Sequence, residues 1–354
     1  MENVPSEMQA VVLRGHGDLD VVQADRVPVP APGPDEVLVD VAAVALNNTD
    51  LWTREGAYGT SDDPDARSGW RGPIDFPRIQ GADVAGTVRA VGSSVGSEWI
   101  GRRVLVDPSI YDGPGDDADP VGLMGSERDG GYAEFVAVPA DQVHDMTDSP
   151  LTDQELAALP TAYGTAFGML ERGRAGAGDV VLVSGASGGV GLAAVQLAKA
   201  RGAHVVAISS AGKAEAVRAA GADVVVDRGQ DDLVRAVRDA SDGGIDVAVD
   251  VVAGRLVSDL VPVLREGGRW VVAGALGGHE VHLDIRRLYL HNKQLIGSSM
   301  HTRAHFRQLT DLARAGAFRP VIAQTWPLEE AAAAQEALAT RGHVGKLLLV
   351  PGRP

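Results

Sequence analysis

Residues 180–202, VVLVSGASGGVGLAAVQLAKARG, carry glycines at the spacing of a dinucleotide-binding turn. Gly188 and Gly191 occupy the second and third glycine positions of that fingerprint, and Ala186 occupies the first. The middle glycine lets a pyrophosphate approach the backbone, and the last lets the following helix pack tightly on the sheet. The helix N-terminus adds N–H groups and a positive dipole. Because an apolar run precedes the turn and a helical pattern follows it, the sequence predicts a bound dinucleotide rather than a bare turn.

A second group of polar residues indicates which dinucleotide binds. NAD enzymes usually place Asp or Glu about 20 residues past the glycine turn, on the ribose hydroxyls. This chain has Ser209 and Ser210 there, followed by Lys213, and its next acid is Glu215. Two hydroxyls and a cation suit a 2′-phosphate, and Arg228 adds a second positive charge. Each is also an ordinary surface residue type, but together they favour NADPH over NADH.

Charge and composition exclude several classes of function. The 354 residues carry a net charge of −16, which repels phosphate backbones and anionic lipid, so we expect neither nucleic acid nor a membrane as a partner. With no cysteine, the chain has no disulfide, no thiolate zinc ligand and no cysteine nucleophile. It has no run of about 18 apolar residues, and its start lacks the features of a secretory signal. We therefore expect a cytoplasmic protein.

The elements that must position these residues follow two patterns. Short alternating apolar runs, broken by Gly and Pro, predict a β-rich domain over the first 150 residues. Two polar stretches, residues 58–73 and 107–131, read as loops whose acids are solvated or, alternatively, hold a cation. From residue 156, strand-length apolar runs occur, the first four separated by helical segments, which predicts a parallel sheet with both faces covered. These runs cover residues 179–184, 204–209, 223–227, 246–252, 269–275 and 294–299. Further helices are predicted over residues 305–316 and 328–342, and a last strand over 345–350.

Seven segments of the chain, in this order, resemble the medium-chain dehydrogenase/reductase superfamily, and most of all its quinone oxidoreductase and zeta-crystallin branch. They are PAPGPDEVLVDVAAVALNNTD, PRIQGADVAGTV, GGYAEFVAVP, SGASGGVG, REGGRWVVAGALGG, LIGSSMHTR and HVGKLLLVP. The resemblance implies an α/β fold, a Rossmann doubly wound parallel sheet plus a β-rich GroES-like catalytic domain, with the active site between them. We place the catalytic domain at residues 1–155 and 300–354 and the Rossmann domain at 156–299. It also implies a homodimer formed through the edge strand at 294–299.

The zinc enzymes of this superfamily hold their catalytic metal with cysteine, histidine and a second cysteine or acid. At the positions that the resemblance aligns with these ligands, this chain has Asn47, Ala82 and Thr161 instead. The lobe that carries four structural cysteines in those enzymes has none here, and the nine histidines show no ligand spacing. We therefore expect a zinc-free protein. Without a metal to stabilise an alkoxide, quinones and α,β-unsaturated carbonyls are the easier hydride acceptors, because conjugation spreads the charge.

The resemblance places the catalytic residues in the segment LNNTDLWTREG. Asn47 matches an asparagine of quinone oxidoreductases, and Asp50, Arg54 and Gly56 complete that pattern. Asn47 is expected either to donate a hydrogen bond to the substrate oxygen or to cap a turn. Thr49 stands where zinc enzymes use a hydroxyl as proton relay, so we expect it to orient the substrate or to pass a proton from solvent; the alternative is a buried hydroxyl that bonds the backbone.

Trp52 departs from the branch, in which tyrosine is typical at that position. The change removes one possible proton donor, and the indole favours stacking on an apolar or aromatic substrate. The loop at residues 56–77 is also longer than is usual in the branch. Its Tyr58, Trp70 and Phe76 either line a substrate pocket or pack the loop on itself.

The remaining cofactor contacts are implied by the resemblance, position by position. The pyrophosphate is assigned to Ser187, Gly188, Gly189, Val190 and Gly191. The turns after the fourth and fifth strands, the latter near the nicotinamide ribose, supply Val252, Ala253, Gly274 and Leu276. Thr165 and Lys346 match positions that often touch the cofactor in the family.

These features predict a zinc-independent, NADPH-dependent oxidoreductase that delivers hydride to quinones or α,β-unsaturated carbonyls. Its expected partner is a small apolar or aromatic carbonyl substrate. One alternative is a metal-free alcohol or carbonyl dehydrogenase that relays a proton through Thr49. Another is a non-catalytic NADPH-binding protein, in which the glycine turn is kept and the catalytic pocket is not. The absence of a strong general base fits a reductase whose cofactor performs the chemistry.

Overall fold

A computed structural model describes residues 4–60, 62–63 and 65–352 and divides the chain into two compact units. Unit 1 comprises Met1–Thr161 and Thr302–Pro354, and unit 2 comprises Ala162–His301. The sequence placed these boundaries at 155/156 and 299/300. The short helix α2 (Asp153–Ala157) stays with unit 1 because it packs on strands β3 (Glu36–Ala45) and β5 (Asp83–Val91).

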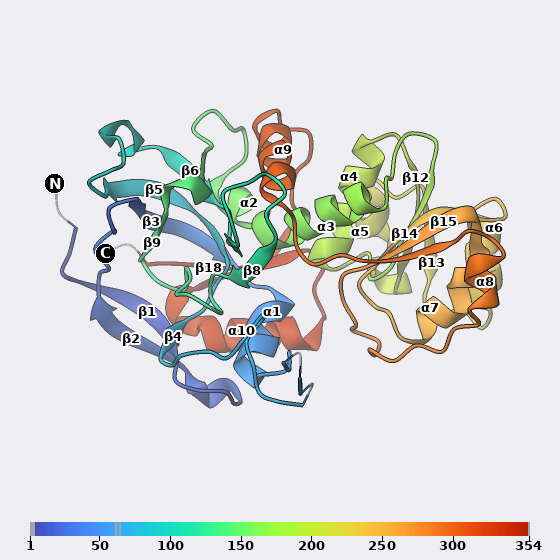
Figure 1. The fold of residues 1–354 in the computed structure, drawn as a ribbon, viewed down its shortest axis with the longest axis horizontal. Coiled ribbons are helices and arrows are strands. Elements are labelled where there is room, and N and C mark those ends of the chain that lie inside the picture. Colours follow the sequence, from blue (N-terminus) through green and yellow to red (C-terminus); the bar gives the residue numbers. More distant parts are fainter. Residues whose placement is uncertain (1–3, 61, 64, 353–354) are drawn as a thin grey trace. The chain divides into compact units, whose positions relative to one another are not determined.

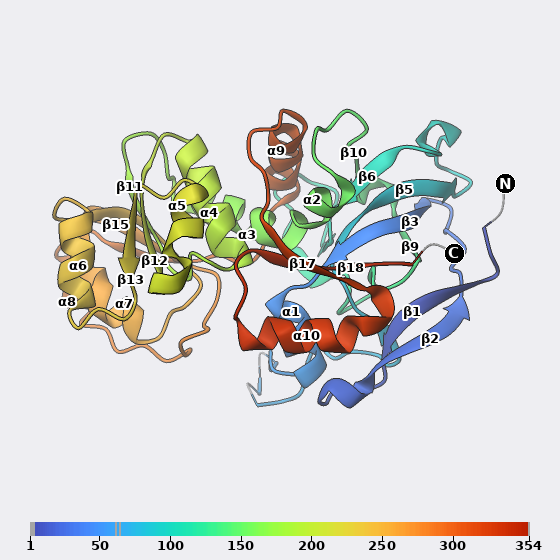
Figure 2. The same ribbon diagram turned by 180° about the vertical axis from the view of Figure 1, so that it is seen from behind.

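Unit 2 is built on a six-stranded parallel sheet with the order β13-β12-β11-β14-β15-β16 (Figures 1 and 2). Its strands are β11 (Val180–Val183), β12 (His204–Ser209), β13 (Val224–Asp227), β14 (Ile245–Asp250), β15 (Leu264–Val272) and β16 (Gln294–Gly297). Each predicted apolar run overlaps one of these strands, and the predicted doubly wound sheet is confirmed.

Helices cover both faces of this sheet. They are α4 (Gly189–Ala200), α5 (Ala214–Ala219), α6 (Leu233–Ala240), α7 (Arg255–Leu260) and α8 (Arg286–Tyr289), with most of α3 (Pro160–Arg172) in the same unit. Leu182 and Trp270 point into the core beneath α6 and α7, whereas Val181 alternates to the other face, where α4 lies. Burial on both faces explains why the sequence shows continuous apolar runs instead of alternation.

Unit 1 is centred on β3, which pairs with three other strands. Its seven-stranded sheet has the order β10-β6-β5-β3-β18-β17, with β9 also paired to β3, and a three-stranded sheet has the order β2-β1-β4. The strands not yet located are β1 (Glu7–Leu13), β2 (Val22–Pro28), β4 (Arg78–Ile79), β6 (Arg103–Val106), β9 (Phe135–Pro139), β10 (Val143–Asp145), β17 (Ile322–Pro327) and β18 (Lys346–Val350). Besides α2, the unit contains the helices α1 (Asn48–Glu55), α9 (Arg303–Arg314) and α10 (Ala331–Thr340), and α10 lies beside α1 (Figure 2).

One predicted loop is partly wrong. Within residues 107–131, strands β7 (Ser109–Tyr111) and β8 (Pro120–Leu123) pair as an antiparallel hairpin. Their few residues are surrounded by Asp, Gly and Pro, which hid the pairing in the sequence. The other loop, residues 58–73, forms neither helix nor strand over its described part; residues 61 and 64 lie outside the described residues. Over the part of the chain that the structure describes, no helix is long and apolar enough to cross a membrane.

Candidate functional site: a dinucleotide turn and a buried Asn–Lys pair

The glycine turn between β11 and α4 has the shape that a bound dinucleotide requires. A Cβ on Gly191 would lie 2.3 Å from Gly185 O, so only glycine lets α4 pack this closely on the turn. A Cβ on Gly188 would meet only Gly185 O, at 3.5 Å, so the space in front of that backbone is open. The sharp bend itself is made by Gly185, whose φ is +56°, and not by Ala186. Sequence reasoning missed Gly185, although a glycine directly before the fingerprint was a visible signal.

The glycine turn and the first turn of α4 together contain the five residues assigned to the pyrophosphate, namely Ser187, Gly188, Gly189, Val190 and Gly191. Gly188 is the N-cap residue, and Gly189 and Val190 are the first two helical residues. The N–H groups at this end of α4 are those that a pyrophosphate would accept from. The structure therefore brings the five predicted pyrophosphate residues together.

The carboxyl end of β12 carries a polar group suited to a phosphorylated ribose. Ser209 is 4% exposed, and its Oγ has no hydrogen-bond partner among the described residues. Ser210 follows it, and Arg228 N donates to Ser209 O at 2.8 Å. Partial burial and the neighbouring charge of Arg228 lower the pKa of Lys213. An orphaned hydroxyl beside two mutually repelling cations fits a ligand that brings an acceptor and negative charge.

The turns after β14 and β15 pack directly on each other. Leu276 N donates to Val251 O at 3.3 Å, and Gly277 N donates to Val252 O at 2.6 Å. A Cβ on Gly274 would lie 3.0 Å from Val251 O. The predicted residues Val252, Ala253, Gly274 and Leu276 are thus brought together.

Asp250, at the end of β14, anchors these turns, and the sequence analysis did not select it. Its carboxylate is fully buried and accepts from Ser184 Oγ and from the backbone N–H of Val252 and Ala253. An Asp at the end of an apolar strand was the available signal. Thr165 lies apart from this group in α3, where its Oγ1 is 3.9 Å from Met300 Sδ.

In unit 1, Asn47 is held by a buried lysine. Asn47 is the N-cap residue of α1, and its backbone N–H donates to Asp50 Oδ2 at 2.7 Å. The Lys346 ammonium donates to Asn47 Oδ1 at 2.5 Å, to Leu46 O at 2.7 Å and to Asp83 Oδ2 at 3.2 Å. Because an ammonium only donates, the atom facing it has to be the Asn47 oxygen, which fixes the orientation of the amide.

This geometry corrects the predicted role of Lys346. The side chain is 5% exposed and all three of its N–H donors are used within unit 1, so none is left for a cofactor. Its partner Asp83 is completely buried and also accepts from Thr161 N at 2.7 Å. Lys346 therefore acts on Asn47, whose Nδ2 makes one long hydrogen bond, 3.4 Å to Ala45 O. No second partner of Nδ2 occurs among the described residues.

Close to Asn47 in the chain, Tyr58 of the following loop contacts two side chains of α1, Thr49 and Trp52. Tyr58 OH donates to Thr49 Oγ1 at 2.8 Å, so the Thr49 hydroxyl hydrogen points elsewhere. The Tyr58 ring meets the Trp52 ring edge-on, with centroids 5.6 Å apart. Burial raises the pKa of Tyr58 and keeps it protonated. A phenol from the following loop thus lies beside the Trp52 ring.

The other aromatic residues of this loop pack inside unit 1. Phe76 contacts the ring of His16 edge-on, with centroids 4.9 Å apart, and Trp70 N donates to Ser126 Oγ at 2.9 Å. Packing of the loop therefore accounts for Phe76, whereas the Trp70 indole is half-buried and lies under the Arg71 guanidinium at 4.6 Å. Gly56, with φ +72°, ends α1 in the left-handed conformation that favours glycine.

Asp50 is a buried acid directly behind Asn47. It is 3% exposed, and desolvation raises its pKa from 3.8 to about 6, helped by the nearby charge of Asp83. Hydrogen bonds from Asn47 N and Tyr132 OH, and the charge of Lys346, oppose the rise. Arg54 Nη1 donates a hydrogen bond to Gln335 Oε1 at 2.7 Å, and this bond joins α1 to α10.

The three positions that hold zinc in related enzymes offer a poor donor set. Ala82 has no ligand atom and is fully buried, and the Asn47 oxygen is occupied by the Lys346 ammonium. Thr161 Oγ1 is buried and has no hydrogen-bond partner within the described part of the chain. A cation 2.5 Å from the single amide oxygen opposes a divalent metal there. Among the described residues, no three His, Cys, Asp or Glu side chains are placed to hold a metal ion.

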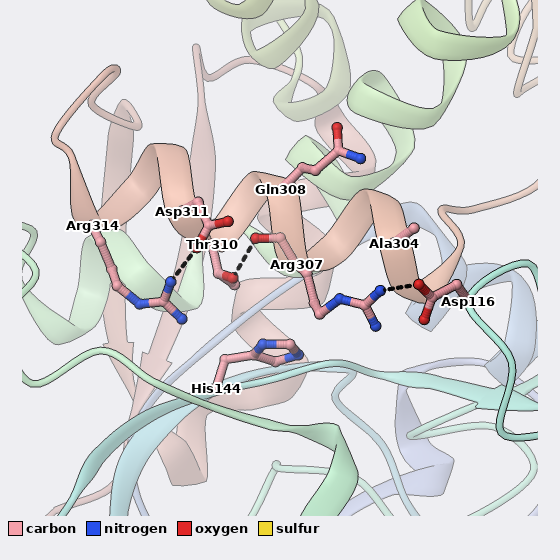
Figure 3. A pocket seen from close by; sticks show the side chains of 8 residues that line it. All are labelled: Asp116, His144, Ala304, Arg307, Gln308, Thr310, Asp311 and Arg314. Carbon is pink, nitrogen blue, oxygen red and sulfur yellow. Dashed lines mark hydrogen bonds and ion pairs between the residues drawn. The ribbon is translucent and has the colours of Figure 1, made fainter.

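A separate hollow lies beside α9 in unit 1 (Figure 3). Its two arginines are paired with carboxylates, Arg307 with Asp116 and Arg314 with Asp311, and His144 lies below them. It contains none of the residues predicted for catalysis or cofactor binding, so it is not the candidate site.

Comparison with known proteins gives consistent assignments along the chain. Residues 33–148 match the alcohol dehydrogenase GroES-like domain, and residues 189–315 match the zinc-binding dehydrogenase family. The quinone oxidoreductase of Rattus norvegicus is 32% identical over 97% of this chain and 98% of its own length.

Two solved structures extend this likeness to the fold. A protein of Sinorhizobium meliloti 1021, described as a candidate alcohol dehydrogenase, is 49% identical with a TM-score of 0.95, over 99% of both chains. The 2-octenoyl-CoA carboxylase reductase, solved with NADP and 2-octenoyl-CoA, is 30% identical with a TM-score of 0.86, over 99% of this chain and 88% of its own. The second of these structures was solved with NADP, and the glycine turn and Ser209 of this chain fit a nicotinamide dinucleotide. From these matches, the chain belongs to the medium-chain dehydrogenase/reductase superfamily and is an oxidoreductase of that type.

Proposed function

We propose that this protein is a zinc-independent, NADPH-dependent reductase of quinones or α,β-unsaturated carbonyls. The observation that carries the proposal is the Lys346–Asn47 pair. The Lys346 ammonium binds the oxygen of Asn47, one of the three positions that hold zinc in related enzymes, and this leaves the Asn47 amide nitrogen as a hydrogen-bond donor. A conjugated carbonyl needs only such a donor, since its developing negative charge is delocalised. Likeness to a quinone oxidoreductase and to a reductase solved with an enoyl thioester supports this substrate class.

NADPH, when bound, supplies the hydride. The residues expected to hold it are the glycine turn for the pyrophosphate and Ser209, Ser210, Lys213 and Arg228 for the 2′-phosphate. Partial burial, and then the charge of Arg228, lower the pKa of Lys213, and a bound phosphate would offset both effects because it brings negative charge. No acid of the kind that NAD enzymes place on the ribose occupies this part of the sequence.

The chain's own residues supply a hydrogen-bond donor and a proton. The Asn47 Nδ2–H is expected to bind the carbonyl oxygen of the substrate. Tyr58 donates to Thr49, so the Thr49 hydroxyl is free to donate onward. A proton lost from Thr49 is replaced from Tyr58, and the partly exposed Tyr58 takes a proton from solvent in the same relay, because its raised pKa disfavours a tyrosinate. The same pair supports the alternative function, a metal-free carbonyl dehydrogenase, because it would protonate an alkoxide as readily as an enolate.

We further propose that the chain forms a homodimer through the β16 edge of unit 2. Ile285, Tyr289 and Leu290 are each 62% exposed, and Leu295 on the edge strand is 44% exposed. Apolar groups gathered beside an unpaired strand edge are typical of an interface between two copies. Equilibrium sedimentation of wild type and of a Leu295→Lys variant tests this, with a monomeric wild type contradicting it.

The first experiment measures NADPH oxidation by chelator-treated protein with 2-cyclohexenone, benzoquinone and cyclohexanone. Turnover of the two conjugated acceptors alone supports the proposal. Turnover of cyclohexanone favours the carbonyl dehydrogenase, and NADPH binding without any turnover favours a non-catalytic binder.

A variant pair tests the role of Asn47. Asn47→Asp keeps an oxygen for Lys346 but removes the N–H donor, so kcat should fall about 10²–10³-fold, as for other lost oxyanion donors. Asn48→Asp makes the same chemical change one residue later, at the first position of α1, and should leave kcat unchanged. Equal activity of both variants would refute the assigned role of Asn47.

A further inference from the structure

Asp250 is a fully buried carboxylate on which three segments of unit 2 converge. Its Oδ1 accepts from Ser184 Oγ at 2.5 Å and from Val252 N at 2.8 Å, and its Oδ2 accepts from Trp270 Nε1 at 2.9 Å. Ala253 N lies 3.1 and 3.2 Å from the two oxygens. These donors belong to the end of β11, the turn after β14 and strand β15. No cationic side chain pairs with Asp250 in the described ranges, and a buried carboxylate of this kind is tolerated because it is hydrogen-bonded in this way.

The turn that Asp250 holds has a backbone that few residues adopt. Ala253 has φ +56°, in the left-handed region that disfavours a residue with a Cβ. Gly254 follows with φ +58°, and a Cβ there would lie 2.4 Å from Gly277 O. The turn is therefore strained and tightly packed on its neighbour. Such a conformation persists only when the surrounding contacts enforce it, and Asp250 provides the polar contacts.

We propose that Asp250 is a positioning residue for the nicotinamide half of the cofactor. Its carboxylate fixes the turn at 251–254 and, through the packing described above, the turn at 273–278, so both are shaped before a dinucleotide arrives. The proposal rests on the proposed function in one respect, since it requires that unit 2 binds a nicotinamide dinucleotide. The adenosine half is assigned to the ends of β12 and β13, which the hydrogen bonds of Asp250 do not reach.

The Asp250→Asn variant separates the two halves of the cofactor. The amide oxygen can still accept from Ser184 and Val252, but the NH₂ group faces the Trp270 N–H, and two donors repel each other. The turn at Ala253 should therefore shift. We expect the Kd for NADPH to rise about 10–100-fold, as for other displacements of binding groups by about 1 Å. The Kd for 2′,5′-ADP, which carries only the adenosine half, should be unchanged.

Isothermal titration of NADPH, NADH and 2′,5′-ADP measures these constants. Val247→Ala is the control, because Val247 is a buried residue of the same strand that touches neither turn through a side-chain hydrogen bond. It should lower stability without changing any Kd. If Asp250→Asn does not fold, Ser184→Ala removes one donor while keeping the charge, and the same half-selective loss is expected, smaller in size.

Each outcome has one meaning. A loss of NADPH affinity with 2′,5′-ADP affinity retained supports the proposal. Equal losses for both ligands, or no loss for either, would overturn it, because Asp250 would then serve only the fold or nothing measurable. If the wild type binds neither NADPH nor NADH, the proposed function itself fails, and this result is distinct from the other two.

Discussion

Asp50 should make unit 1 less stable as the pH rises from 4 to 7, and the Asp50→Asn variant should remove that dependence. Burial raises the pKa of Asp50 from 3.8 to about 6, so between these values the folded chain holds a proton that the unfolded chain has released. The contribution to stability is complete below pH 3.8 and is lost as the pH rises through 6. At 1.36 kcal/mol for each pKa unit, the loss is about 3 kcal/mol in total.

Urea unfolding at pH 4.5, 6 and 8 measures this effect in wild type and variant. Of the total, about 2 kcal/mol falls between pH 4.5 and pH 8, and the stability of the variant relative to wild type should rise by that amount. The variant keeps an oxygen for Asn47 N and Tyr132 OH, so the comparison isolates the charge. Asp117→Asn is the matched control, because Asp117 is exposed in the same unit. A difference between variant and wild type that stays constant with pH, or falls, would refute the reasoning.

Three further predictions concern the cofactor turn and the metal. Gly188→Val should abolish NADPH binding without unfolding the chain, because the φ of Gly188 is −84° and the added atoms enter open space. Gly191→Ala should instead lower the melting temperature. A calorimetric scan and an NADPH titration of each variant test both expectations. Lys213→Ala should raise the Kd for NADPH roughly tenfold or more and leave that for NADH unchanged, because it removes one charged hydrogen bond to the 2′-phosphate. Elemental analysis of purified protein should find no stoichiometric zinc, because the Lys346 ammonium repels it; one zinc atom per chain would contradict the assignment.

The sequence predicts the parallel sheet well because its signals are local. Strands buried on both faces appear as apolar runs, and Gly188 and Gly191 stand in a fixed spacing between strand and helix. The hairpin of β7 and β8 was not predicted, because pairing between short polar segments depends on their register and not on periodicity. Its two strands carry too few apolar residues to stand out.

The parts of the site that sequence reasoning missed depend on contacts between distant residues. Lys346 lies 299 residues from the Asn47 oxygen that it holds, and nothing near either residue indicates the pair. Asp250 meets Ser184 across 66 residues, and Gly185 shows its role only through its φ angle. Tyr58 was recognised as a pocket candidate, but its hydrogen bond to Thr49 required the fold. Local pattern thus predicts the elements, whereas the polar contacts between them require the structure.

The discontinuous course of unit 1 has a consequence for synthesis on the ribosome. All of unit 2, Ala162–His301, emerges before Thr302–Pro354, which supplies β17, β18 and α10. Until then β3 lacks its neighbour β18, and the Asp83 carboxylate lacks the Lys346 ammonium that binds it in the complete chain. The incomplete sheet presents an open strand edge of the kind that chaperones protect and that aggregates when translation stalls. The Asn47 amide, translated early, therefore acquires the orientation that Lys346 gives it among the last events of chain completion.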